Sequence, residues 1–258
     1  MRPALDSLSV IDPRARIAED VSIGPFCWIG PHVTLESGVT LDSHVRIDGH
    51  TTLGRGVRVH AGAVLGGPPQ DLKFKGVESY LTIGDRTVIR ECVTANLATE
   101  EGESTRIGAD CLIMAYAHVA HNTIVSDRVI LANGVQLAGY VTIDPYAIVG
   151  GLVPVHQFVR IGAHSMVGGG CRVTQDVLPY TRAAGHPLKP IGLNVVGLQR
   201  RGFSEATIAS IKQAYRLLLR SGLKLEDACV RIRALDPDVP ELEHFVSFAL
   251  ESRRGLTR

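Results

Sequence analysis

An aliphatic residue returns every six positions along most of this chain, and this repeat constrains the fold more strongly than any other feature. A period of six matches neither an α-helix, with about 3.6 residues per turn, nor a strand, whose sides alternate. Units this short cannot bury an apolar face alone, so they stack on their neighbours as a solenoid. The repeat predicts a triangular coil in which each hexad contributes one short strand and one corner. The inward anchors are Ile11, Ile17, Ile23, Ile29, Leu35, Leu41, Ile47, Leu53, Val59 and Leu65, then Ile83 and Ile89, then Ile107, Ile113, Val119, Val125, Leu131, Leu137, Ile143, Val149, Val155, Ile161, Val167 and Val173.

A small or β-branched residue stands four positions after each anchor, as Cys27 and Ala117 do, and suits a tight corner. Two segments break the pattern, at about 66–81 and about 95–106. Loops that leave a rigid scaffold are where binding residues concentrate. We therefore expect both segments to lie near a functional site. The second segment is acidic and contains Glu100, Glu101 and Glu103.

The repeat ends near Val177, and the rest of the chain has a helical period. Ser204 is a suitable N-cap for a first helix, and Gly222 suits its end. We expect a solenoid domain at 1–186 and a C-terminal α-helical domain at 187–258 that covers the last coil. The expected linker contains Pro179, Gly185, Pro187 and Pro190, and two shorter helices are expected at about 225–235 and 240–251.

Composition narrows the class of protein. The net charge of +1 gives no general attraction for nucleic acid. No apolar run is long enough for an integral membrane segment. The N-terminal residues lack the basic and apolar regions of a signal peptide, so we expect a cytoplasmic protein. The cysteines are odd in number and scattered, which fits a reducing compartment: Cys27, Cys92, Cys111, Cys171 and Cys229.

Two histidines point outward from one part of the coil. Because Val119 is an inward anchor, His118 and His121 face outward on either side of it. One coil is about 18 residues, so Gly139 stacks beside His121 in the next coil. The same addition brings further polar residues to one outer strip, which comprises His118, His121, Gly139, Tyr140, His156 and Gln157.

A neutral imidazole can remove a proton from a hydroxyl group at physiological pH. A glycine one coil away can present its N–H to a developing oxyanion. A single outward histidine is more often a solvated polar residue, whereas the combination of His118, His121 and Gly139 favours a catalytic site.

Six short motifs along the chain carry a further signal: Gln70-Asp71-Leu72-Lys73, Gly84-Asp85-Arg86, Ile89-Arg90-Glu91, Ala117-His118-Val119-Ala120-His121, Val155-His156-Gln157-Phe158 and Gly197-Leu198-Gln199-Arg200-Arg201-Gly202-Phe203. Together they resemble the motifs of the UDP-N-acetylglucosamine O-acyltransferases, which catalyse the first step of lipid A biosynthesis. The resemblance covers essentially the whole chain and implies a left-handed parallel β-helix of hexapeptide repeats. It implies transfer of an (R)-3-hydroxyacyl chain from acyl carrier protein to the 3-hydroxyl of a UDP-sugar.

The resemblance assigns a role to each site residue. It implies that His121 is the general base and that the N–H of Gly139 stabilises the oxyanion. It places Asp71 and Lys73 on the sugar nucleotide across a subunit boundary of a homotrimer. It places Gly169 at the pocket for the acyl chain. The other implied substrate-binding residues are His118, Tyr140, His156, Gln157, Asn194, Arg200 and Arg201.

Some positions differ from the family pattern. Asn122 replaces a common Asp after the base; an amide can orient the imidazole but adds no negative charge, which predicts a weaker base. Tyr140 replaces a frequent His, and Val196 a frequent Glu. Ala95-Asn96-Leu97-Ala98 stands where His-Arg-Gly is usual. The acceptor therefore stays open between UDP-N-acetylglucosamine and a 3-amino analogue, and the acyl length is unspecified.

General-base chemistry predicts no need for a metal or dissociable cofactor. Three alternatives remain at this point. One is the related N-acyltransferase of the same pathway, which normally has a further domain before its repeats. Another is a γ-type carbonic anhydrase, a trimeric β-helix that holds zinc with histidines between subunits, for which His118, His121 and His156 could supply three nitrogens. The third is a scaffold without catalytic activity.

Overall fold

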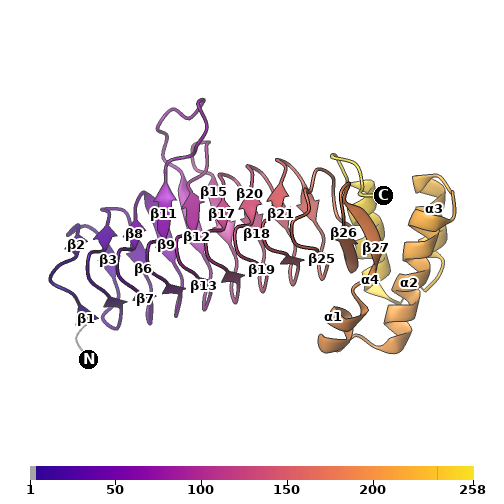
Figure 1. The fold of residues 1–258 in the computed structure, drawn as a ribbon, viewed down its shortest axis with the longest axis horizontal. Helices are drawn as coiled ribbons and strands as arrows, with labels where there is room; N and C mark the ends of the chain where they lie inside the picture. The colour runs from indigo at the N-terminus through magenta and orange to yellow at the C-terminus, as the bar shows by residue number, and fades with distance from the viewer. Residues whose placement is uncertain (1–3, 237) are drawn as a thin grey trace.

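The computed structural model describes residues 4–236 and 238–258 and contains a parallel β-helix followed by a helical C-terminal part (Figure 1). The strands of the β-helix form three sheets, which we name A, B and C. Along the coils, a strand pairs in parallel with the strands one coil before and one coil after it, and only the last pair of sheet A among the described residues is antiparallel. The chain therefore passes from sheet A to sheet B to sheet C in every coil.

The strand bounds follow the repeat closely. Sheet A contains β1 (Ala4–Leu5), β4 (Ser22–Ile23), β7 (Thr40–Leu41), β10 (Arg58–Val59), β13 (Val88–Ile89), β16 (Leu112–Ile113), β19 (Ile130–Leu131), β22 (Ile148–Val149), β25 (Met166–Val167), β26 (Thr181–Ala184) and β27 (Lys189–Leu193). Sheet B contains β2 (Val10–Ile11), β5 (Trp28–Ile29), β8 (Arg46–Ile47), β11 (Val64–Gly67), β14 (Thr94–Asn96), β17 (His118–Val119), β20 (Gln136–Leu137) and β23 (Pro154–Val155). Sheet C contains β3 (Arg16–Ile17), β6 (Thr34–Leu35), β9 (His50–Leu53), β12 (Tyr80–Ile83), β15 (Ser104–Ile107), β18 (Ile124–Val125), β21 (Thr142–Ile143) and β24 (Arg160–Ile161).

The predicted anchors form the core of the β-helix. From Ile23 to Val173 they are at most 3% exposed, and the small residues between them are buried as well. Ile11 and Ile17 are only partly buried. Strand β1 adds one hexad before the predicted start of the repeat, because its Leu5 pairs in register with Ile23.

The corners of the coil use left-handed backbone conformations. Asn122, Tyr140 and Phe158 have φ of 57°, 61° and 64° and stack at the corner between sheets B and C. Among the residues that the structure describes, the non-glycine residues at such corners include no β-branched side chain, the type that this backbone region disfavours most strongly. Because successive coils repeat this corner conformation, the side chains that flank it stack in columns on the outside of the molecule.

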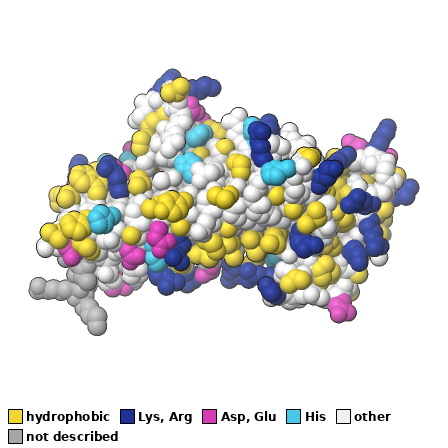
Figure 2. Space-filling model, in the orientation of Figure 1, with side chains coloured by type: hydrophobic (Ala, Val, Ile, Leu, Met, Phe, Trp, Pro, Cys, Tyr) yellow, Lys and Arg dark blue, Asp and Glu magenta, His cyan; other side chains and the backbone are white. Residues whose placement is uncertain are grey.

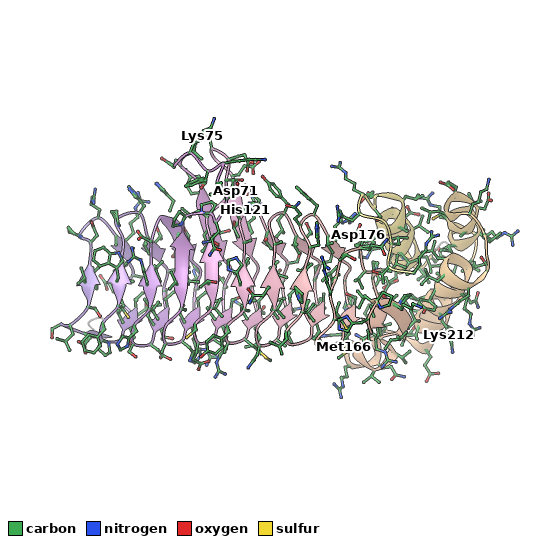
Figure 3. All side chains as sticks on the ribbon, turned by 45° about the horizontal axis from the view of Figure 1, so that its top comes forward. Asp71, Lys75, His121, Met166, Asp176 and Lys212 are labelled. Carbon is green, nitrogen blue, oxygen red and sulfur yellow. The ribbon has the colours of Figure 1, made fainter. Side chains whose placement is uncertain are left out.

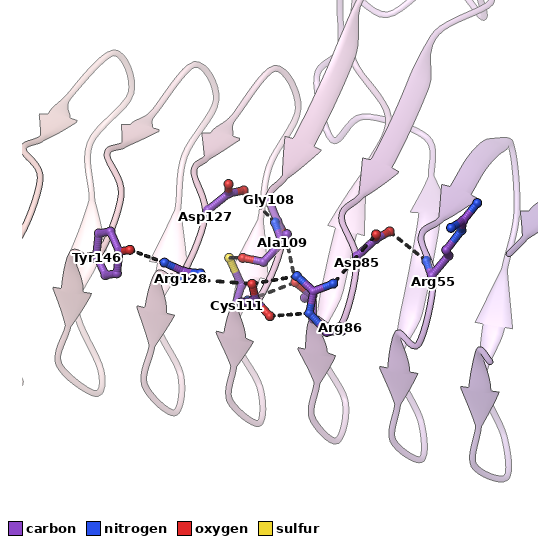
Figure 4. A network of polar contacts seen from close by, with 11 residues as sticks. Arg55, Asp85, Arg86, Gly108, Ala109, Cys111, Asp127, Arg128 and Tyr146 are labelled. Atoms are coloured by element: carbon purple, nitrogen blue, oxygen red, sulfur yellow. Dashed lines mark hydrogen bonds and ion pairs between the residues drawn. The ribbon is translucent and has the colours of Figure 1, made fainter. Parts of the chain in front are cut away.

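The corner between sheets C and A carries a ladder of charged and polar side chains (Figure 4). Arg86 Nε donates to Asp110 Oδ1 at 2.7 Å, and Arg128 lies 3.7 Å from the same carboxylate. Arg128 also donates to the hydroxyl of Tyr146. These groups are largely exposed, so each pair contributes little to stability.

Two loops project from one side of the solenoid (Figure 1). One joins β11 to β12 and spans 68–79; the other joins β14 to β15 and spans 97–103. We call the second one the acidic loop. Both lie within the segments where the repeat is interrupted, and both emerge beside the corner that carries Asn122.

The C-terminal part contains two elements that the sequence did not predict. The residues read as a linker instead form the antiparallel hairpin β26–β27, and a short helix α1 (Val195–Arg200) follows it. Both elements were missed, whereas the three later helices were predicted: α2 (Glu205–Arg220), α3 (Leu225–Arg233) and α4 (Pro240–Leu250). Ser204 caps α2 by accepting a hydrogen bond from Thr207 N–H.

The helices share one core with the end of the solenoid. Leu178 and Tyr180 pack with the buried side chains of α2, α3 and α4. The C-terminal tail returns to the last coil, where Thr257 N–H donates to Asp176 O at 2.9 Å. The hairpin spans the proposed domain boundary at residues 186 and 187, and a division at that point stays a prediction.

Candidate active site

The ring of His121 lies directly on Gly139. His118 and Val119 in β17 pair with Gln136 and Leu137 in β20, so the corners that follow stack as well. A Cβ atom at Gly139 would stand 2.4 Å from His121 Cε1 and 2.6 Å from Nε2. Only glycine leaves room for the imidazole in this position. The stacking expected from the repeat is therefore confirmed at the level of side-chain contact.

The amide of Asn122 holds the other nitrogen of that ring. Its Oδ1 lies 3.0 Å from His121 Nδ1 and also accepts the backbone N–H of Thr99 at 3.0 Å. An acceptor shared in this way requires the proton on Nδ1. Nε2 then carries a lone pair and can act as a base.

The acidic loop completes this arrangement. Asn122 Nδ2 donates to Glu100 Oε2 at 2.9 Å and to Glu103 Oε2 at 2.5 Å. Tyr140 donates its hydroxyl proton to Glu100 Oε1 at 2.6 Å. Hydrogen bonds from Thr99 and then Tyr140 lower the pKa of Glu100 to about 2. Burial, and then Glu100, raises the pKa of Glu103.

The sequence did not assign these loop residues to the site. Thr99, Glu100 and Glu103 were noticed only as part of an acidic interruption of the repeat, although that interruption was the available signal. The Asn122 side chain adds no negative charge of its own, but the acidic loop supplies negative charge beside it. Two carboxylates lie one residue further out, on the donor side of the Asn122 amide.

An open cavity of about 610 Å³ lies in front of these groups. Figure 3 labels Asp71 and His121 on the side of the solenoid from which the loops project. Asp71 and Lys73 of the 68–79 loop reach the cavity from the same chain as His121, although the resemblance implied a neighbouring subunit. Asp71 Oδ1 accepts the N–H of Lys73 at 2.9 Å, which shapes this part of the loop. The lining residues are Asp71, Lys73, Thr99, Glu100, His121, Tyr140, Gln157 and Phe158.

A second groove of about 650 Å³ shares Tyr140 and Phe158 with this cavity. The two rings stack with centroids 4.9 Å apart. Arg160 and Arg254 line the far part of the groove, towards the C-terminal tail. Together, the His121 cavity and this groove form a long surface that contains acidic, aromatic and basic sections.

His118 occupies a more enclosed place behind His121. Its Nδ1 is 2.7 Å from the hydroxyl of Thr94, its partner in the neighbouring strand β14. Burial, and then the neighbouring His121, lowers the pKa of His118. Its ring is therefore neutral at neutral pH and can exchange hydrogen bonds with a polar ligand.

The remaining predicted residues lie outside the lining of the His121 cavity. His156 Nδ1 is 3.2 Å from Arg254 and 3.1 Å from the carbonyl of Gln157. Asn194 caps α1 and donates to His164 O at 2.9 Å. Arg200 is exposed, and the guanidinium of Arg201 lies over Tyr146. Gly169 is exposed at a corner, beside the backbone of Gly151.

Within one chain, the three histidines of the zinc alternative do not converge. His118, His121 and His156 each direct Nδ1 to a different partner: Thr94, Asn122 and Gln157. Among the described residues, no three His, Cys, Asp or Glu side chains lie close enough to share one metal ion.

None of the helices in the described residues is both long and apolar enough to span a bilayer.

Comparison with known proteins agrees with this geometry. Residues 104–139 match the family model of bacterial transferase hexapeptide repeats, and residues 176–257 match domain 2 of UDP-N-acetylglucosamine O-acyltransferase. The acyl-[acyl-carrier-protein]–UDP-N-acetylglucosamine O-acyltransferase of Alkalilimnicola ehrlichii is 48% identical over 98% of this chain and 99% of its own length.

Solved structures show the same relationship. The acyltransferase LpxA of Acinetobacter baumannii superimposes with a TM-score of 0.96, at 40% identity over 99% of this chain and all of its own. UDP-N-acetylglucosamine acyltransferase of Arabidopsis gives a TM-score of 0.86 at 32% identity, over 98% of this chain and 100% of its own.

Fold and site together define a hexapeptide-repeat acyltransferase built on a left-handed parallel β-helix. Within that class, the chain belongs to the acyl-[acyl-carrier-protein]–UDP-N-acetylglucosamine O-acyltransferase family. The carbonic anhydrase and the N-acyltransferase are not favoured as alternatives.

Proposed function

We propose that the chain transfers an (R)-3-hydroxyacyl group from acyl carrier protein to the 3-position of UDP-N-acetylglucosamine or of its 3-amino analogue. The observation that carries this proposal is the imidazole of His121 lying on Gly139 at the edge of an open cavity. The activity for which the relative from Alkalilimnicola ehrlichii is named supplies the donor and the acceptor.

His121 and Gly139 divide the chemistry between them. His121 Nε2 removes the proton of the sugar hydroxyl as its oxygen attacks the thioester carbonyl, which forms the C–O bond. The carbonyl oxygen becomes an oxyanion, and the N–H of Gly139 donates to it. Within the described residues this N–H has no hydrogen-bond acceptor. When the tetrahedral intermediate collapses, the C–S bond breaks and the thiolate takes the proton from His121.

Other side chains would bind the substrates. Lys73 supplies a point charge for phosphate beside Asp71, and Gln157 lines the same cavity. Tyr140 is held towards the acidic loop, and neutral His118 lies behind the base. We assign the nucleotide to Asn194, Arg200 and Arg201, the acyl chain to the glycine corner at Gly169, and a further substrate contact to His156. These five residues lie apart from His121, so this assignment needs a substrate that extends along the groove.

We also propose a cytoplasmic homotrimer. All five cysteines are free thiols, which suits a reducing compartment. Large apolar side chains are exposed along the corner between sheets A and B, where a neighbouring subunit can cover them.

Mass spectrometry of reaction products tests the proposed function. The purified chain is incubated with a panel of 3-hydroxyacyl thioesters of acyl carrier protein and with each acceptor. We expect an ester or an amide at the 3-position, with one acyl length preferred. An absence of acyl transfer to both acceptors across the panel would contradict the proposal.

A further inference from the structure

We infer that Glu100 and Glu103, acting through the amide of Asn122, position and polarise the general base His121. The inference rests on the proposed function. It concerns a chain of contacts that starts at the catalytic imidazole and ends at two carboxylates on the acidic loop.

The orientation of the Asn122 amide follows from its partners. The N–H of Thr99 is a donor and needs an acceptor, so the amide oxygen faces Thr99 and His121. The carboxylates of Glu100 and Glu103 are acceptors and need donors, so the amide nitrogen faces the acidic loop. A flipped amide would lose every one of these hydrogen bonds. Asn122 is only 9% exposed, so water does not readily replace them.

The two carboxylates act on the base through this amide. Each N–H of Nδ2 donates to one carboxylate, and hydrogen bonds to charged acceptors are stronger than neutral ones. Hydrogen bonds in a chain polarise one another, which makes Oδ1 a better acceptor for Nδ1–H of His121. When His121 takes up a proton from the substrate, the negative charge behind Asn122 stabilises the imidazolium.

Hydrogen bonds hold the acidic loop in the position from which it contacts Asn122. Thr99 donates its hydroxyl proton to Glu100 at 2.6 Å, and Tyr140 donates to the other oxygen of Glu100. These hydrogen bonds keep the pKa of Glu100 at about 2, so its charge persists through the working pH range. Both glutamates are exposed, so solvent reduces their effect on His121. The titratable groups around the base are His118, Tyr140, Glu100 and Glu103, with Asp71 and Lys73 across the cavity.

Steady-state kinetics against pH test the inference. In Glu100→Gln/Glu103→Gln we expect kcat to fall about tenfold at the alkaline plateau while KM changes by less than about twofold. The acid limb of kcat/KM should move to lower pH, because less negative charge favours the imidazolium less. The matched control is Glu101→Gln in the same loop, where Glu101 accepts the N–H of Glu78. Equal profiles for the double variant and this control would overturn the inference.

A pair of substitutions that moves a carboxylate from Glu103 to position 122 distinguishes this electrostatic role from a purely structural one. Asn122→Asp alone places a third carboxylate against Glu100 and Glu103 and removes their donor, so we expect activity to fall. Adding Glu103→Gln supplies a donor to the new carboxylate, and we expect activity to recover at least about threefold. No recovery, with unchanged thermal unfolding, would overturn the inference. A wild-type chain without acyl transfer would contradict the proposed function instead.

Discussion

His121 is a base because of its two neighbours in space. Asn122 fixes the proton on Nδ1, and the missing Cβ of Gly139 lets Nε2 lie open to the cavity. Gly139 is distant from His121 in the sequence, but the coil brings residues about 18 apart side by side. The pairing of His121 with Gly139 is therefore a product of the repeat.

We predict that His121→Ala lowers kcat by about two to four orders of magnitude, the usual contribution of a general base. The side chain points outward and lies over Gly139, so its loss opens no cavity in the core. Thermal unfolding should stay within a few degrees of the wild type, measured by circular dichroism. Near-normal turnover in a folded variant would show that another group accepts the proton.

We predict that Gly139→Ala also reduces turnover strongly while the β-helix stays folded. The new methyl group would stand 2.4 Å from His121 Cε1, so the ring must leave its position over the backbone. Gly67→Ala is the matched control, since its methyl group would meet only Asn96 Nδ2 at 3.5 Å. Turnover at the wild-type level in Gly139→Ala would mean that the ring position observed over Gly139 is not needed.

The sequence identified the site residues that the repeat itself places together. His121, Gly139 and Tyr140 occupy corners in register, so counting residues was enough. Glu100 and Glu103 reach the site through a loop whose path obeys no period. Their contact with Asn122 depends on how the chain returns from Ala98 to Ser104, which periodicity does not encode.

Among the elements, strands were predictable wherever an aliphatic anchor marks them. The hairpin β26–β27 was missed because its prolines and glycines suggested a linker. Pro190 lies in β27, the last strand of sheet A, where an edge position tolerates a residue without an N–H. The short helix α1 lacks the length that makes a helical period visible, and its cap Asn194 was assigned to nucleotide binding.

The corner that joins the solenoid to the helices predicts a pH-dependent stability. His164 stacks on Tyr146 with centroids 4.7 Å apart and contacts Phe203. Burial, and then Arg201, lowers its pKa from 6.5 to about 4. Between these two values the unfolded chain binds a proton that the folded chain does not, so stability falls as pH falls through this window. Well below pH 4 both the folded and the unfolded chain bind the proton, and this contribution becomes constant.

His164→Phe should flatten that dependence, because phenylalanine keeps the stacking and does not titrate. We expect the difference in melting temperature between pH 6.5 and pH 4 to be smaller in the variant than in the wild type. Circular dichroism at several pH values measures it. Equal slopes in the two proteins would show that His164 binds its proton equally well in the folded state.

Across the whole molecule, positive charge is concentrated at the helical end, although the net charge is only +1. Lys and Arg side chains lie over the helical end of the face in Figure 2. We predict that an acidic acyl carrier protein docks here and that its apparent affinity falls between low and high salt, since exposed charges act over about 10 Å at 0.1 M. Kinetics at several salt concentrations measure this; constant affinity would contradict it. The basic residues concerned are Arg160, Arg172, Arg182, Lys189, Arg200 and Arg201.

The flat faces and exposed corners of a solenoid favour side-by-side association, and we predict a homotrimer. At the corner between sheets A and B, Phe26, Tyr116 and Leu152 are 55%, 66% and 73% exposed. Single apolar residues are common on surfaces, but three at one edge suit a subunit interface. Sedimentation equilibrium at micromolar concentration should give three times the mass of one chain. Leu152→Glu should weaken the assembly, whereas Val230→Glu, at a similarly exposed position on α3, should not. A monomeric mass for the wild-type chain would refute the trimer.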